Sequence, residues 1–102
     1  MVEIRNLTKK RVPLKTLLEL AERILKKEKR EGKDLSVVFV GPQRMRRLNK
    51  MYRGKDYVTD VLSFSMKEFG LGEIILCPAK IRKDARKYGI VFEQELVRVF
   101  TH

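Results

Sequence analysis

Five residues with charged or aliphatic hydroxyl side chains lie within eight positions near the middle of the chain. They belong to the stretch YRGKDYVTDVLSF, residues 52–64, which changes from polar to apolar at position 61. Asp and Thr side chains bond nearby backbone amides and favour turns, whereas a guanidinium offers a planar set of donors to a phosphate. The stretch is therefore consistent with a hydrogen-bonded connector or with part of a phosphate-binding site. The five residues are Arg53, Lys55, Asp56, Thr59 and Asp60.

Arg53 has two interpretations of its own. It could form an ordinary ion pair with Asp56 or Asp60, or those carboxylates could hold it while its remaining donors face a phosphate. The sequence alone does not separate these alternatives.

The charge balance favours a polyanionic partner. Twenty-four Lys and Arg against thirteen Asp and Glu give the 102-residue chain a net charge of +11 and a pI near 10.1. An imbalance of this size favours contact with RNA or DNA. The alternative is the charged surface of a thermophilic protein, which would be expected to mix both signs.

Composition also predicts the compartment. No stretch approaches the ~20 apolar residues of a membrane span, and Met1 is followed by VEIRNL rather than by a secretory pattern. The single cysteine, Cys77, cannot form an internal disulfide and is expected to be a buried apolar residue. We therefore expect a cytoplasmic protein without a membrane partner.

Hydrophobic periodicity predicts strands alternating with amphipathic helices, which should position the polar stretch between a helix and a strand. The order strand, helix, strand suggests a right-handed crossover between parallel strands. The expected fold class is α/β (α+β), a small mixed sheet of about four strands with packed helices. Strand 35–40 is continuously apolar and is expected to be covered on both faces. The expected strands are 2–7, 35–40, 61–64 and 73–77, and the expected helices are 14–31, 42–53, 78–88 and 92–102.

The last expected helix has no stop signal before the chain ends. Residues 1–102 are therefore expected to form a single domain that lacks a C-terminal part. An incomplete domain of this kind would leave apolar surface of helix 92–102 exposed and would tend to associate.

Three blocks of sequence resemble the YbeY family of rRNA-maturation endoribonucleases in both order and spacing. Ser65 replaces the usual proline at the end of the first block. The blocks are LNKMYRGKDYVTDVLSFS (48–65), LGEIILC (71–77) and FEQELVRVFTH (92–102). The resemblance implies a zincin-like fold with the edge strand of the sheet beside the cleft.

The family's metal motif is His, three residues, His, five residues, His. Two histidines one helical turn apart face the same way, and three imidazoles leave a coordination position for water. Only the first of these matches here, as His102. The resemblance implies zinc in the complete family protein, and we expect that this chain does not bind it stably.

The resemblance assigns roles to the polar stretch and to the helix before it. It implies cleavage of single-stranded RNA, in small-subunit rRNA 3′-end maturation and ribosome quality control, with RNA and the ribosome rather than DNA as partners. Arg53 and His102 would be catalytic, His102 as a metal ligand, and the cleft would be supported by Asp56, Thr59 and Asp60. The residues expected to bind RNA phosphates are Arg53, Lys55, Arg46, Arg47 and Lys50.

Two other functions stay open. One is a non-catalytic module that binds rRNA or the ribosome, because two of the three family histidines are missing. The other is a metal hydrolase on the same scaffold that acts on a small phosphoester.

Overall fold

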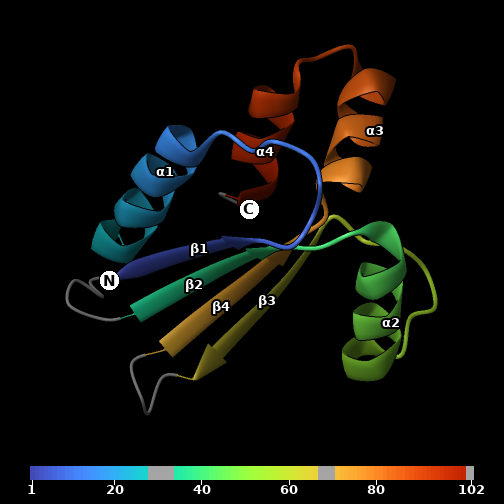
Figure 1. Ribbon diagram of the computed structural model, residues 1–102, viewed down its shortest axis with the longest axis horizontal. Helices are drawn as coiled ribbons and strands as arrows, with labels where there is room; N and C mark the ends of the chain where they lie inside the picture. The colour runs from blue at the N-terminus through green and yellow to red at the C-terminus, as the bar shows by residue number, and fades with distance from the viewer. Residues whose placement is uncertain (28–33, 67–70, 101–102) are drawn as a thin grey trace.

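A single mixed sheet with helices on both faces forms the framework of the protein (Figure 1). The computed structural model describes residues 1–27, 34–66 and 71–100. Its strands are β1 (Val2–Asn6), β2 (Asp34–Phe39), β3 (Val61–Met66) and β4 (Leu71–Leu76). Its helices are α1 (Leu14–Lys27), α2 (Pro42–Arg53), α3 (Pro78–Tyr88) and α4 (Phe92–Phe100). The expected α/β fold class, with about four strands and packed helices, is confirmed.

The strand order places β3 at an edge of the sheet. The order is β1-β2-β4-β3. β1 pairs with β2 and β2 pairs with β4 in parallel, whereas β3 pairs with β4 antiparallel. Helix α1 lies between β1 and β2 in the chain, and these two strands are parallel as expected. An edge strand has backbone groups on one side that no neighbouring strand takes up.

The larger core lies between the sheet and helices α1, α3 and α4, which cover one face together (Figure 1). Alternate residues of β2 point into it, as the period of a strand requires. Each of the three helices contributes the apolar side of an amphipathic pattern. Its central residues include Leu17, Val37, Phe39, Ile81 and Leu96, all at 0% exposure.

Helix α4 packs more completely than the sequence suggested. Leu96, Val99 and Phe100 are 0%, 7% and 6% exposed, because they pack into the larger core. The prediction of an exposed apolar surface on this helix is therefore wrong for its described part, where Val97, at 37%, is the large apolar residue that is exposed.

Helix α2 lies on the opposite face and packs a smaller core against β3 and β4 (Figure 1). Helix α2 covers this face only over β3 and β4, so Ser36 on β2 remains partly exposed. The prediction that strand 35–40 is covered on both faces is wrong at this position. The smaller core consists of Val40, Met45, Leu62, Ile75 and Cys77.

Proline and glycine set the bounds of α2. Pro42 stands in its first turn, where its missing N–H has no partner to lose. Gly54 ends it with φ 68°, a left-handed conformation that costs glycine little. The N–H of Gly54 donates to the Lys50 carbonyl at 3.0 Å. The chain thus leaves α2 directly into the polar stretch 55–60.

Candidate nucleic-acid interface

The outward side of α2 carries a row of cations. Helical spacing separates most of this row from Met45 and Asn49, which are 0% and 2% exposed on the inward side, whereas Arg53, four residues after Asn49, lies at the margin. Five basic side chains within one short helix create a local positive potential that attracts polyanions. The row consists of Arg44, Arg46, Arg47, Lys50 and Arg53, all exposed.

Two of these cations are bound to a carboxylate from the following loop. Arg46 Nε donates to Asp56 Oδ1 at 2.8 Å, and Lys50 Nζ lies 4.0 Å from Asp56 Oδ2. The hydrogen bond from Arg46 lowers the pKa of the Asp56 carboxyl, and the same bond raises the pKa of Arg46. Asp56 therefore orders the cations around it and neutralises part of their charge.

Arg53 lies apart from this ion pair. Its Nη2 donates a long hydrogen bond of 3.4 Å to the carbonyl of Ser63, on the edge strand β3. Among the described residues Arg53 pairs with no carboxylate. The ion pair with Asp56 or Asp60 that the sequence left open is not formed, so most donors of the guanidinium can face a ligand.

Asn49 anchors the loop that carries these groups, and sequence reasoning missed it. Its side chain is buried at the end of α2, and its Nδ2 donates to the Tyr57 carbonyl at 3.0 Å. The N–H of Lys55 donates to the Asn49 carbonyl at 3.3 Å. A polar residue inside a helical pattern is usually on the surface, so only the tertiary contact identifies this role.

The far end of the loop is fixed by backbone contacts. The N–H of Cys77 donates to the Asp60 carbonyl at 3.0 Å, which joins the loop to the end of β4. The hydroxyl of Thr59 donates to Asp60 Oδ1 at 3.3 Å. Cys77 itself is buried at 0% exposure, and this burial raises the pKa of its thiol.

The remaining residues that the sequence singled out are less constrained. Arg47 and Lys55 are exposed, and within the described ranges their side chains form no ion pair. His102 lies outside the described residues. Residues 1–27, 34–66 and 71–100 contain no group of three His, Cys, Asp or Glu side chains that could hold a metal ion. The described residues alone therefore do not fit a metal centre.

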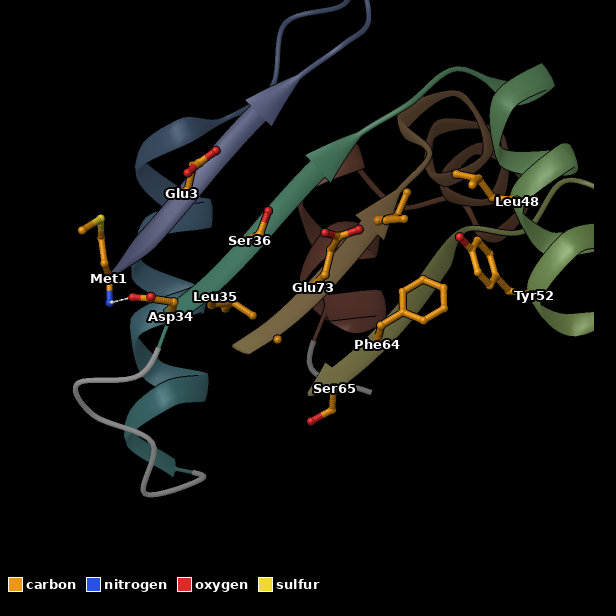
Figure 2. A pocket seen from close by; sticks show the side chains of 12 residues that line it. Met1, Glu3, Asp34, Leu35, Ser36, Leu48, Tyr52, Phe64, Ser65 and Glu73 are labelled. Carbon is orange, nitrogen blue, oxygen red and sulfur yellow. Dashed lines mark ion pairs between the residues drawn. The ribbon is translucent and has the colours of Figure 1, made fainter. Parts of the chain in front are cut away.

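A groove of about 670 Å³ runs across the open face of the sheet beside α2 (Figure 2). Tyr52 from α2 and Phe64 from β3 form one end, with ring centroids 5.1 Å apart and planes at 69°. Glu73 on β4 points into the middle, and Glu3 on β1 lies toward the far end (Figure 2). The groove thus combines aromatic and apolar walls with carboxylates.

The class of protein is a small α/β domain with a cationic helix along one edge of a mixed sheet. No helix in the described ranges combines the length and apolarity needed to cross a membrane.

Comparison with known proteins then identifies the family. The sequence model described as Endoribonuclease YbeY matches residues 3–102, and the chain belongs to this family.

Two curated relatives, both described as Endoribonuclease YbeY, illustrate the match. The protein from Thermotoga neapolitana is 35% identical over 102 residues, which cover 100% of this chain and 68% of the relative. The protein from Thermodesulfovibrio yellowstonii is 47% identical over 74 residues, which cover 67% of this chain and 46% of the relative.

A solved structure agrees with the fold. The solution structure of a protein from Thermotoga maritima is similar with a TM-score of 0.66 at 32% identity, over 97% of this chain and 66% of that one. The chain thus spans between about half and two thirds of the length of these similar proteins.

Proposed function

We propose that this chain is the RNA-binding part of a metal-dependent endoribonuclease that cleaves single-stranded RNA. Membership of the YbeY family supports this assignment. The observation that carries it is Arg53, a guanidinium at the edge of the sheet that no carboxylate neutralises among the described residues. Such a group can hold a phosphate through two parallel N–H donors.

The chain's own residues account for binding and orientation. The exposed cations of α2 attract the phosphate backbone without regard to sequence, and they release counterions as RNA binds. Arg53 then holds one phosphate beside β3, where its donors would also stabilise negative charge that develops during cleavage. Asn49 supports this geometry because it fixes the loop after the helix. We place the activity in the cytoplasm, as the single cysteine suggests.

The metal part of the proposal depends on residues beyond those described. A zinc ion in such an enzyme lowers the pKa of a bound water and polarises a phosphate. His102 is the histidine that this chain would contribute as a ligand, by its match to the family motif. It is also the single histidine of the sequence. The described residues do not form a three-ligand site of their own.

The proposed substrate is the 3′ end of small-subunit rRNA, and the proposed partner is the ribosome, both by family resemblance. A second candidate function is a module that binds rRNA or the ribosome without cleaving. Its support is the row of exposed cations on α2, which would bind RNA whether or not the chain cleaves it. Both functions predict RNA binding, but only the first predicts cleavage.

Arg53→Ala tests the proposal, with Arg44→Ala as the matched control. Both variants remove one exposed cation from α2, but only Arg53 reaches the sheet edge. With zinc supplied in excess, we expect Arg53→Ala to reduce cleavage of a labelled single-stranded RNA about 100-fold, and Arg44→Ala to change it less than threefold. In binding titrations each variant should lower the slope of log K against log salt by about 0.7 per lost phosphate contact.

The outcomes separate the two functions. RNA binding that weakens in Arg53→Ala, without any cleavage by the wild-type chain, would favour the binding module. Equal losses in the two variants would show that only net charge matters and would remove the assigned role of Arg53.

A further inference from the structure

The proposed phosphate contact does not use the groove on the open sheet face. We propose that its α2 end is a nucleobase pocket, which takes the base of a nucleotide whose phosphate is held by Arg53 and which prefers guanine. This inference rests on the proposed RNA-binding function and names a substrate-positioning site for it.

The pocket lies next to the phosphate contact, because residues adjacent in the sequence form the two sites. Tyr52 precedes Arg53 at the end of α2, and Phe64 follows Ser63 on β3. Arg53 and Ser63 are joined by the 3.4 Å hydrogen bond, while Tyr52 and Phe64 form the aromatic pair on the groove side. A phosphate at the first pair and its base at the second would therefore lie within the span of one nucleotide.

The aromatic pair has the exposure that a stacking platform needs. Tyr52 is 58% exposed although it belongs to the inward pattern of α2, and Phe64 is partly exposed. Leu48 and Ile75 also line the groove and add apolar surface to it. Bases stack on such rings regardless of sequence, since every base has a π-face. The groove volume of about 670 Å³ falls within the range of small-ligand sites, roughly 300–1,000 Å³.

Glu73 supplies the preference for one base. Its carboxylate points into the groove between Phe64 and Ser36 (Figure 2). In the described part of the chain this carboxylate has no hydrogen bond or ion pair with another side chain. A carboxylate only accepts, so it favours a base edge with two adjacent donors. Guanine offers this edge through N1–H and N2–H, whereas uracil offers a single N–H.

The charge distribution keeps the backbone out of the pocket. Carboxylates of Glu3 and Glu73 line a groove on a chain of net charge +11. They repel phosphates from the interior, while the cations of α2 attract phosphates outside it. A neutral base inside the groove avoids the repulsion by the carboxylates, and an anionic backbone at Arg53 lies where the cations attract it. A Lys- and Arg-rich protein segment would fit the carboxylates too, but the adjacency of Tyr52 and Arg53 favours RNA.

The test compares two single-stranded pentanucleotides, UUGUU and UUUUU, by fluorescence anisotropy with the whole chain. We expect UUGUU to bind several-fold more tightly and Glu73→Gln to abolish that preference. Tyr52→Ala should weaken UUGUU binding about tenfold, since a stacked base contributes roughly 1–3 kcal/mol. Tyr52→Phe should retain the affinity because it keeps the ring. Tyr57→Ala is the matched control, since Tyr57 is 53% exposed and does not line the groove.

A second arm uses guanosine, which has no phosphate, and follows the ring signals of Tyr52 and Phe64 by NMR. Shifts of these signals would support the pocket even if the chain neither cleaves RNA nor depends on Arg53 for binding it. RNA binding that needs Arg53 but is unchanged in Tyr52→Ala would overturn the pocket and leave the proposed function intact. A Lys-rich peptide that shifts the signals when guanosine does not would assign the groove to a basic protein partner and overturn the proposal.

Discussion

Asn49→Asp is the substitution that most directly tests how the loop beside Arg53 is held. The Asn49 side chain is 2% exposed, and its Nδ2 donates to the Tyr57 carbonyl at 3.0 Å. An ionised Asp has nearly the same shape but cannot donate, so it would place a buried negative charge against a carbonyl oxygen. An uncompensated buried charge costs about 3 kcal/mol or more. For a domain of this size that loss lowers Tm by roughly 12 °C.

Acidification should reverse the loss. A protonated carboxyl regains a donor, so burial should raise the pKa of the introduced Asp above the unfolded value of about 3.9. The destabilisation relative to wild type is then small below pH 4 and grows as the pH rises through the raised pKa. Asn49→Ala lacks a titrating group and should lose about 1 kcal/mol at every pH.

The assay is urea denaturation at pH 4 and pH 7, followed by circular dichroism. Met51→Asp is the control, because it introduces the same charge on the same helix at a residue that is 71% exposed. Its expected change in the free energy of unfolding is within about 0.5 kcal/mol. Equal losses for the two Asp variants at pH 7, or a loss in Asn49→Asp that persists at pH 4, would refute the anchoring role.

Three further predictions concern the charges, the metal and the thiol. Asp56→Asn should tighten RNA binding several-fold in anisotropy titrations, because it releases Arg46 from its ion pair. Lowering the pH through the depressed pKa of Asp56 should also tighten binding, since it protonates the carboxylate. Weaker RNA binding in either experiment would contradict this prediction. The purified chain should contain well under one zinc per molecule by elemental mass spectrometry, since it has one histidine, and a stoichiometric ion removed by chelator would contradict the expectation. The Cys77 thiol should react slowly with a disulfide reagent in the folded chain and rapidly in urea, because burial raises its pKa; equal rates would show that it is accessible.

Local patterns predicted the elements well because their signals do not depend on tertiary context. Periodicity predicted an amphipathic helix at 92–102, and Leu96, Val99 and Phe100 on the apolar side of α4 are buried. The expected helix ends at 53 and 88 agree with the structure, where Gly54 and Gly89 follow them with φ 68°. Strand bounds shifted by one or two residues, since the ends of strands depend on which neighbour pairs with them.

The arrangement of the site could be predicted only in part. The sequence predicted phosphate contacts for several cations of helix 42–53, but it could not show that Asp56 binds Arg46 while Arg53 reaches Ser63. Tyr52 fits an apolar helical pattern and is nevertheless 58% exposed, because α2 covers only the β3 side of the sheet. The groove depends on that placement of the helix, which no local pattern encodes.

The division of the apolar interior into two clusters has a consequence for motion. Helix α2 rests on the small cluster around Met45, while the other helices share the large one around Phe39. Elements with fewer buried contacts open at lower free energy than the rest of a protein. Amide protons of α2 should therefore exchange with solvent sooner than those of α1 or α4. The segment that carries Arg53 could then adjust to an incoming strand while the scaffold beneath it keeps its shape.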